Sequence, residues 1–322
     1  MRGNSPTNKA WAAALTRIEK QIQGQLTSED AFVGRFLRHA SQGRGKRLRA
    51  RLVLLAAAAV GKLSGQVDRL ASALELLHQA TLAHDDVIDG AADRRHRPTL
   101  NARFGNETAV LVGDLMFSQA MNLLVTDMPT RISRIVARSV TQVCLGEIQE
   151  IKFYKKPDLH PAEYLEMISH KTASLLSACC EGGAVVGKGT PGQARALAEY
   201  GRNFGIAFQI QDDLLDLTGD KTRVGKPVGL DLQEGRVTLP VIYGLRSSHR
   251  QVRQAVLQEL RHPLPRREVL LRALEGCGAL EQSRDLALNY AEKAGKNLKA
   301  LPASAAKQEL LDLAVFAVER DH

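Results

Sequence analysis

Three aspartates in a DDxxD pattern, Asp85, Asp86 and Asp89, close the stretch 74–89, LELLHQATLAHDDVID. Apolar residues recur through this stretch at close to every 3.6 positions, which predicts a helix. On that helix Asp89 shares a face with both other aspartates, so the carboxylates repel one another and the pKa of at least one should rise. A hard divalent cation relieves this repulsion, and proteins commonly hold magnesium with one or two carboxylates together with substrate phosphates. The pattern therefore indicates a magnesium site that serves a phosphate-bearing substrate.

A second DDxxD pattern, at Asp212, Asp213 and Asp216, lies in another apolar stretch, FQIQDDLLDL. Gln209 stands three residues before it, so the four side chains share one helical face. A single acidic cluster on a helix is usually a solvated surface. Two identical clusters, each set in an apolar helix, favour carboxylates that face inward, and buried carboxylates must be paired or bind a cation.

Further motifs accompany these clusters: GRGKRLR from position 43, DRRHRP from 93, HKTASLL from 170 and GKPVGLDLQEGRVTLP from 225. With both DDxxD patterns, they make the sequence resemble the trans-type polyprenyl diphosphate synthases from about position 43 to 240, and more weakly beyond. The resemblance implies an all-α fold, a single large helical bundle of the isoprenoid synthase type with a central cavity. It also implies Mg²⁺ as cofactor and two substrates, isopentenyl diphosphate and an allylic diphosphate, farnesyl or geranylgeranyl.

The resemblance also implies a role for individual residues. Isopentenyl diphosphate would be bound by Lys46, Arg49, His78 and Arg95. The allylic diphosphate would be bound by Arg94, Lys171, Lys226 and Arg236, the last standing where the family often has lysine. Thr172 and Gln209 would lie beside the allylic group and, with Lys171 and Lys226, form the catalytic set. Two further positions differ from the family pattern, because Arg44 and His96 replace residues that are commonly glycine.

Product length should depend on the helix that carries the first aspartate pattern. Ala80 and Thr81 precede Asp85 by about one turn, roughly 6 to 8 Å along the axis. Family members that stop at short products have aromatic side chains at these depths, whereas both residues are small here. We therefore expect an open tunnel and a product of roughly 30 to 50 carbons, octaprenyl-like, by the same helix-depth argument. Leu77, further down, leaves a geranylgeranyl product as the alternative.

Length and composition favour one all-helical domain over residues 1–322, because 44% of the residues are hydrophobic, 11 are proline and no low-complexity linker divides the chain. The longest apolar run, 52–60, has nine residues, so it is shorter than the roughly 20 that a membrane span needs. The N-terminal residues lack the pattern of a secretory signal peptide. We therefore expect a cytoplasmic protein without a membrane span. The four cysteines lack ligand spacing and read as reduced core thiols.

A net charge of +9 raises the possibility of a nucleic-acid partner. The aromatic content is only 4%, without the basic and aromatic interleaving of single-strand binders, and basic residues cluster at 44–51 and 94–97 beside the acidic motifs. Diphosphate substrates explain this arrangement better, so no nucleic-acid partner is expected. A terpene cyclase, a non-catalytic partner subunit of a heteromeric synthase and a basic scaffold remain as alternatives, although both DDxxD patterns are complete. The resemblance also implies a homodimer.

Overall fold

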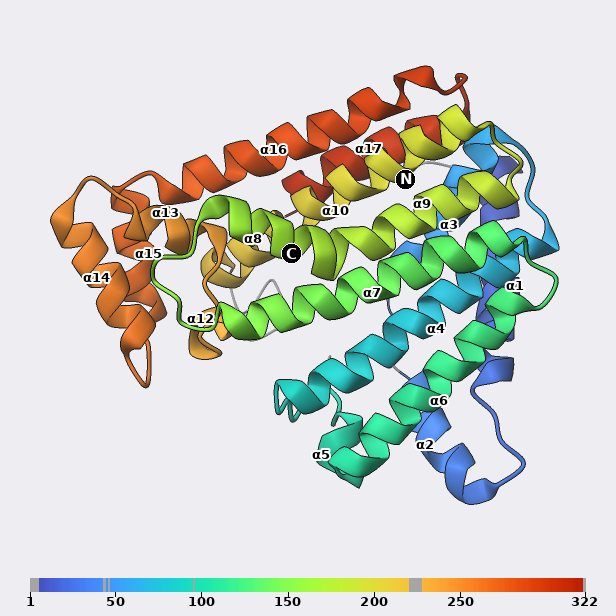
Figure 1. Cartoon of the computed structure of the whole chain (residues 1–322), viewed down its shortest axis with the longest axis horizontal. Helices are drawn as coiled ribbons and strands as arrows, with labels where there is room; N and C mark the ends of the chain where they lie inside the picture. The colour runs from blue at the N-terminus through green and yellow to red at the C-terminus, as the bar shows by residue number, and fades with distance from the viewer. Residues whose placement is uncertain (1–5, 43–44, 46, 95, 220–227, 321–322) are drawn as a thin grey trace. The chain divides into compact units, whose positions relative to one another are not determined.

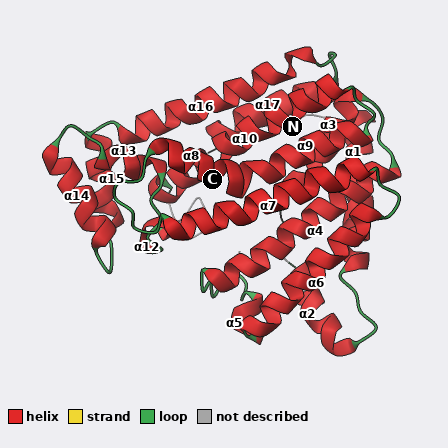
Figure 2. Cartoon of the chain, in the orientation of Figure 1, coloured by secondary structure: helices red, strands yellow, loops and turns green. Residues whose placement is uncertain are grey.

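The computed structural model describes residues 6–42, 45, 47–94, 96–219 and 228–320, and Figure 1 traces their helices. Helices connected by turns and loops make up this part of the chain, and no strand occurs among the described residues (Figure 2). The all-α prediction is therefore confirmed. The predicted residues Lys46, Arg95 and Lys226 lie outside the described residues, as does Arg44.

The chain forms two compact units. The first consists of residues 1–136, 179–195 and 301–308, and the second of residues 137–178, 196–300 and 309–322. Four of the five boundaries fall within helices, and the fifth, at 300/301, follows a short 3₁₀-helix. The prediction of one domain over residues 1–322 stays a prediction, and the two units are described separately.

The first unit is built around a 24-residue helix, α4 (Gly65–Ile88), which packs against α1, α3 and α6. Its other complete helices are α1 (Pro6–Gln25), α2 (Ala31–Ser41), α3 (Leu48–Val60), α5 (Leu100–Phe104) and α6 (Asn106–Val125). Between positions 67 and 77 every residue of α4 except Arg69 is buried, and most of these side chains are apolar. The first DDxxD pattern lies at the C-terminal end of this buried helix, so the packing of α4 holds the backbone of the pattern in place.

α6 is the one helix of the described chain that is long and apolar enough to cross a membrane by length and composition. Only 39% of its most apolar window is buried, and Leu111 and Val125 are 67% and 63% exposed. Its glycine at position 113 faces His84 of α4, where a Cβ atom would collide with the imidazole ring. The helix thus packs closely on α4 with one side and leaves apolar side chains exposed on another.

The second unit packs its helices around an apolar core that includes Tyr164, Ile210, Leu214 and Leu239. Its helices are α8 (Pro161–Ile168), the π-helix η1 (Ser169–Ala173), α12 (Leu230–Gln233), α13 (Leu239–Leu245), α14 (Arg250–Arg261), α15 (Arg267–Gly276), α16 (Ala279–Asn297) and the 3₁₀-helix η2 (Leu298–Ala300). Four helices have residues in both units: α7 (Thr130–Lys152), α9 (Ser174–Val186), α10 (Pro191–Thr218) and α17 (Ala305–Glu319). α10 carries the second DDxxD pattern.

Candidate active site

The first aspartate pattern lies at the end of α4, where Asp85 and Asp86 occupy the last turn and Asp89 is the residue after the helix. Asp86 is 5% exposed, and it accepts a hydrogen bond of 2.7 Å from Nε of Arg94. Burial raises the pKa of Asp86, and the Arg94 guanidinium opposes that rise. Asp85 is half-buried and Asp89 is exposed. Arg94, predicted as a diphosphate ligand, therefore lies against the first cluster.

The loop after Asp89 is fixed by hydrogen bonds to the end of α4. The Ala91 amide donates to the Asp86 carbonyl at 2.9 Å, and the Asn101 side-chain amide donates to the carbonyls of Asp86 and Ala91, each at 3.1 Å. The Thr99 hydroxyl donates to the Ala91 carbonyl at 2.7 Å. The position of Arg94 is thus set by the structure of its loop as well as by its ion pair.

The start of α3, which holds the predicted ligand Arg49, is positioned by a glutamate that belongs to no sequence motif. Glu75 of α4 is 4% exposed and accepts a 3.0 Å hydrogen bond from the Ala50 amide at the beginning of α3. Its other oxygen lies 3.4 Å from the guanidinium of Arg47, which also pairs with Glu19 at 2.9 Å. Arg47 has a left-handed backbone, with φ 49°. Glu75 therefore caps α3 from a neighbouring helix.

The residues predicted to set product length lie on the same helix. Leu77 and Ala80 are each 1% exposed, whereas Thr81 and the predicted ligand His78 are half-buried. The Thr81 hydroxyl donates to the His78 carbonyl at 2.9 Å, so the helix itself satisfies this polar group. At Leu77, Ala80 and Thr81, α4 therefore carries only small or aliphatic side chains.

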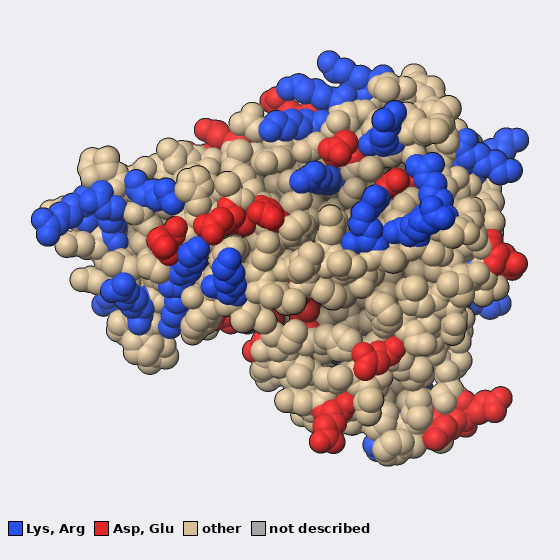
Figure 3. All heavy atoms as spheres, in the orientation of Figure 1, with Lys and Arg blue, Asp and Glu red and all other residues tan. Residues whose placement is uncertain are grey.

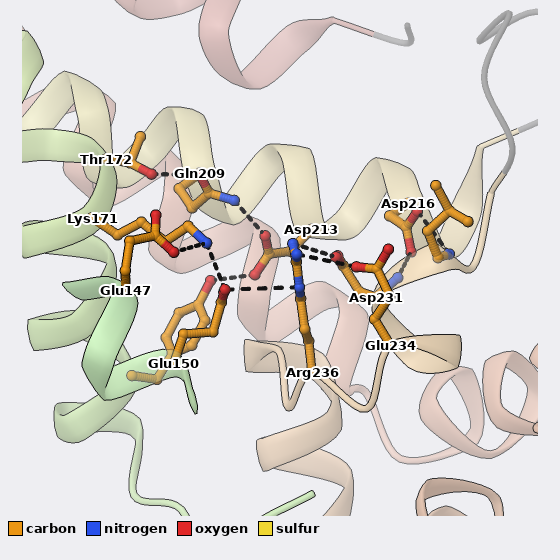
Figure 4. A network of polar contacts seen from close by, with 12 residues as sticks. Glu147, Glu150, Lys171, Thr172, Gln209, Asp213, Asp216, Asp231, Glu234 and Arg236 are labelled. Atoms are coloured by element: carbon orange, nitrogen blue, oxygen red, sulfur yellow. Dashed lines mark hydrogen bonds and ion pairs between the residues drawn. The ribbon is translucent and has the colours of Figure 1, made fainter. Parts of the chain in front are cut away.

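The second aspartate pattern is joined to the predicted catalytic residues by a chain of hydrogen bonds (Figure 4). The Thr172 hydroxyl donates to the side-chain carbonyl of Gln209 at 2.8 Å, and the amide nitrogen of Gln209 donates to Asp213 at 2.8 Å. The second oxygen of Asp213 accepts a 2.6 Å hydrogen bond from the hydroxyl of Tyr164. Asp213 is 5% exposed, and burial raises its pKa to about 7, against the effect of these two donors. Tyr164 was not identified from the sequence.

Lys171 lies between two carboxylates of α7, at 2.9 Å from Glu147 and 2.5 Å from Glu150. Burial lowers the pKa of Lys171, but the two glutamates outweigh that effect, so the pKa is raised and the side chain is a cation. Lys171 and Thr172 lie in η1, and a π-helical turn holds more residues than an α-helical one. Gly146 allows α7 to approach this turn, because a Cβ atom there would collide with the Lys171 backbone.

A fourth carboxylate, Asp231, adds to the second aspartate pattern. The amides of Leu230 and Asp231 donate to the two carboxylate oxygens of Asp216 at 3.2 and 3.1 Å, so Asp216 caps α12 (Figure 4). Burial raises the pKa of Asp231 well above its ordinary value, and the charges of Asp213 and Asp216 add to that rise. The motif GLDLQEGR contains this aspartate, but its spacing alone did not indicate that it would lie beside the DDxxD residues.

Arg236 and Arg320 supply cations to the same unit. Arg236 lies 3.6 Å from Asp231, 3.1 Å from Glu234 and 3.8 Å from Glu150. Arg320 lies 3.2 Å from Asp212, and it also donates to the Phe208 carbonyl at 3.0 Å. Arg236 was predicted as a ligand, whereas no motif indicated Arg320, because its contact to α10 spans 108 positions of sequence.

The donor set of these clusters fits a hard divalent cation. Burial raises the pKa of Asp213, Asp216 and Asp231, and the charges of neighbouring aspartates add to each rise, as expected for oxygen ligands that a cation would relieve. Each carboxylate oxygen can accept more than one partner, so the hydrogen bonds above orient these groups without excluding a cation. Within the described part of the chain, no three His, Cys, Asp or Glu side chains are arranged to hold a metal ion alone. Magnesium often takes only one or two protein carboxylates together with substrate phosphates.

The structure brings together Lys171, Thr172, Gln209, Asp213 and Arg236 in the second unit, and Asp86 and Arg94 in the first. The arrangement of the two aspartate patterns around one cavity stays a prediction, since they belong to different units. Each group combines oxygen ligands for a cation with basic side chains for a diphosphate. Such a site can bind and ionise a diphosphate ester.

Known proteins of similar sequence and structure identify the family to which the chain belongs. A family model described as Polyprenyl synthetase matches residues 30–274. Octaprenyl diphosphate synthase of Escherichia coli (strain K12) is 34% identical over 319 residues, 98% of each chain, and geranylgeranyl diphosphate synthase of Methanosarcina mazei is 35% identical over 283 residues, 86% of each. A polyprenyl synthase from Caulobacter crescentus CB15, solved with calcium and isoprenyl diphosphate, has a TM-score of 0.91 at 33% identity, covering 98% of this chain and 97% of that one. The chain therefore belongs to the polyprenyl synthetase family of trans-type polyprenyl diphosphate synthases.

Proposed function

We propose that this trans-prenyltransferase condenses isopentenyl diphosphate head-to-tail with an allylic diphosphate, farnesyl or geranylgeranyl, and repeats the step to give an all-trans polyprenyl diphosphate of medium or long chain. The observation that carries the proposal is the hydrogen-bonded connection from Thr172 through Gln209 to the buried Asp213, with Lys171 beside it. A cation, a hydroxyl and an amide that converge on an aspartate of a DDxxD pattern suit an allylic diphosphate, whose ionisation needs both charge stabilisation and polar oxygens.

The aspartates of the two patterns would hold Mg²⁺, which when bound supplies positive charge to the diphosphate as it leaves. Lys171 and Arg236 add protein cations to the same leaving group, together with Lys226 and Arg94. The oxygens of Thr172 and Gln209 face the allylic carbon and stabilise its positive charge. The apolar residues around them exclude the water that would otherwise quench it.

The bond changes balance without an external acid or base. The allylic carbon–oxygen bond breaks and diphosphate departs with the electron pair. The terminal double bond of isopentenyl diphosphate, held by Lys46, Arg49, His78 and Arg95, then forms the new carbon–carbon bond. Loss of one proton restores a double bond, and the released diphosphate accepts that proton.

Small residues at Ala80 and Thr81 support a product of roughly 30 to 50 carbons, because neither side chain would block a product tunnel beside α4 about one turn below Asp85. The full-length similarity to an octaprenyl diphosphate synthase favours this product. A geranylgeranyl product is the alternative, and the similarity to a synthase of that name supports it. Leu77 is the next side chain that would limit the chain in that case.

We also propose a cytoplasmic homodimer that binds no nucleic acid. Leu111 and Val125 leave an apolar face on α6, and a second copy of the chain would cover it. A second apolar surface occurs on the part of α7 that belongs to the second unit, where Ile148 and Ile151 are 63% and 64% exposed. Faces of this kind are typical of surfaces that become buried in an oligomer.

The test is to incubate the purified protein with Mg²⁺, isopentenyl diphosphate and farnesyl diphosphate, and to measure the products by mass spectrometry. A series that ends in one long prenyl diphosphate would establish the reaction and the length together. Geranylgeranyl diphosphate as the sole product would support the alternative length. Absence of any product, with Asp212→Asn as the inactive reference, would point to a non-catalytic partner subunit or a basic scaffold.

A further inference from the structure

The helical hairpin of α14 and α15 carries a positive charge, and none of its arginines has a role in the proposed reaction. Residues 246–272 contain seven arginines and two glutamates, a net charge of +5 out of the +9 of the whole chain. Glu259 is 1% exposed and is already paired with Arg266 at 2.5 Å. Figure 3 shows basic side chains over the region that α14 and α15 occupy in Figure 1. More than half of the protein's net charge is therefore concentrated in one helical hairpin.

Several of these arginines lack a compensating carboxylate. They are exposed, and none forms an ion pair with a described residue: Arg246, Arg250, Arg261 and Arg272. On α14, Arg250 and Arg261 lie within about 20° of each other around the axis and about 16 Å apart along it. Val256 and Leu260 of the same helix are buried in the core of the unit. The helix thus holds its arginine face outward by packing its other face.

The connection between the two helices ends in an exposed leucine. Leu264 is 79% exposed and stands between Pro263 and Pro265 in the sequence HPLPR. Its amide donates to the ring of His262 at 3.0 Å, and the Arg266 amide donates to Glu259 at 2.8 Å. Because proline fixes φ and both ends are hydrogen-bonded, the leucine is presented by an ordered turn. An apolar side chain is therefore available to a partner at the tip of the hairpin, next to the arginines of α14 and α15.

We infer that residues 246–272 dock the protein on an anionic membrane surface, with Leu264 entering the headgroup region and the arginines contacting acidic lipid headgroups. Interfacial segments combine basic residues with an apolar contact in this way. A nucleic acid suits the hairpin less well, since it has no Phe, Trp or Tyr for stacking and its projecting side chain is aliphatic. The inference rests on the proposed function in one respect: a long prenyl product is a lipid and must pass to a bilayer.

The strength of the interaction should be additive and sensitive to salt. Each arginine close to an anionic leaflet contributes about fivefold in affinity, so the loss of Arg250 and Arg261 together should weaken binding by about 25-fold. Loss of the apolar part of Leu264 should weaken it by roughly fivefold. Salt should weaken the arginine contribution, because exposed charges are screened within about 10 Å at 0.1 M ionic strength.

The experiment is co-sedimentation of the full-length protein with vesicles of phosphatidylcholine alone or mixed with phosphatidylglycerol. The wild type should sediment only with the phosphatidylglycerol vesicles, and both Leu264→Ser and the double variant Arg250→Ser/Arg261→Ser should lose binding by the factors above. The matched control is Arg134→Ser/Arg195→Ser, which removes two other exposed arginines of α7 and α10 and should bind like the wild type. Prenyl transfer measured without vesicles should be unchanged in all variants.

Three results would overturn the inference: no sedimentation of the wild type with anionic vesicles, an equal loss in the control, or binding to duplex DNA that needs the same arginines while vesicles are not bound. The activity assay separates this failure from failure of the proposed function. Turnover without vesicle binding would reject the membrane surface alone, whereas vesicle binding without turnover would retain the surface and reject the enzyme reaction.

Discussion

At the scale of single residues, the second aspartate pattern depends on partners that come from distant parts of the chain. Asp213 receives one hydrogen bond from Gln209, four residues away, and another from Tyr164, 49 residues away. The first pair could be foreseen from the helical period. The second could not, because PAEYLEMI contains no motif and the tyrosine is placed by the packing of α8 in the apolar core.

The Tyr164→Phe variant should test the importance of this contact, since it removes only the hydroxyl that Asp213 accepts from. We expect the turnover rate to fall about tenfold, as is usual when a group that orients a metal-binding carboxylate is removed, and the apparent affinity for Mg²⁺ to fall with it. The KM for isopentenyl diphosphate should stay unchanged. Steady-state kinetics at varied Mg²⁺ would measure all three quantities. Tyr154→Phe, at a 58% exposed tyrosine, is the control, and an equal effect in both variants would reject the interpretation.

At the scale of elements, helix ends position the predicted ligands. Glu75 of α4 caps α3, and Asp216 of α10 caps α12, so in each case a carboxylate of one helix fixes the start of another. Helical stretches and their buried faces follow from the 3.6-residue period. Caps between helices cannot be predicted in this way, because they depend on which helices become neighbours.

The Glu75→Ala variant should lower the free energy of unfolding by about 3 kcal/mol, because it leaves Arg47 with one partner fewer in a buried site and exposes the Ala50 amide to an apolar surrounding. Urea denaturation would measure the loss. We also expect a higher KM for isopentenyl diphosphate, since Arg49 lies in the same first turn of α3. Glu29→Ala, an exposed site, is the control. A stability equal to the wild type would show that the cap is dispensable.

Replacing Ala80 or Thr81 by phenylalanine should shorten the product. Either ring would obstruct the product tunnel about one turn below Asp85, so growth of the prenyl chain should stop earlier. Product sizing by mass spectrometry is the measurement, with Gln79→Phe as a control on another face of the helix. Overpacking at the buried Ala80 should cost about 1 to 3 kcal/mol, so Thr81→Phe provides the test at a half-buried site. Unchanged product length in both variants would refute the tunnel assignment.

At the scale of the whole molecule, the sequence predicted the all-α class and the family correctly, because these depend on periodicity and on motifs that keep their order. It did not anticipate two compact units, since four of their five boundaries lie inside continuous helices. It also gave no function to residues 241–322, although Arg320 of that segment contacts Asp212. Long-range contacts of this kind have no local sequence signal.

The exposed face of α6 yields a prediction about assembly. Leu111→Glu should convert the proposed dimer to a monomer, because it places a charge in an apolar surface that a second copy would bury. Sedimentation velocity over a range of protein concentrations would measure the change. The control is Glu107→Gln, at the exposed start of α6. Asn101→Glu on the neighbouring α5 is unsuitable as a control, because the Asn101 side chain donates to the Ala91 carbonyl of the loop. A wild type that sediments as a monomer would contradict the proposal.

The π-helical turn Ser169–Ala173 makes the site depend on the number of residues in this part of the chain. A π-helical turn closes its hydrogen bonds between residues five apart, so it holds one residue more than an α-helical turn, whose bonds join residues four apart. Deleting one residue from this turn would rotate everything before it by about 100° relative to α9. Lys171 would then no longer point toward Glu150, and Thr172 would no longer point toward Gln209. The site therefore depends on the length of the chain at this turn as well as on the identity of its side chains.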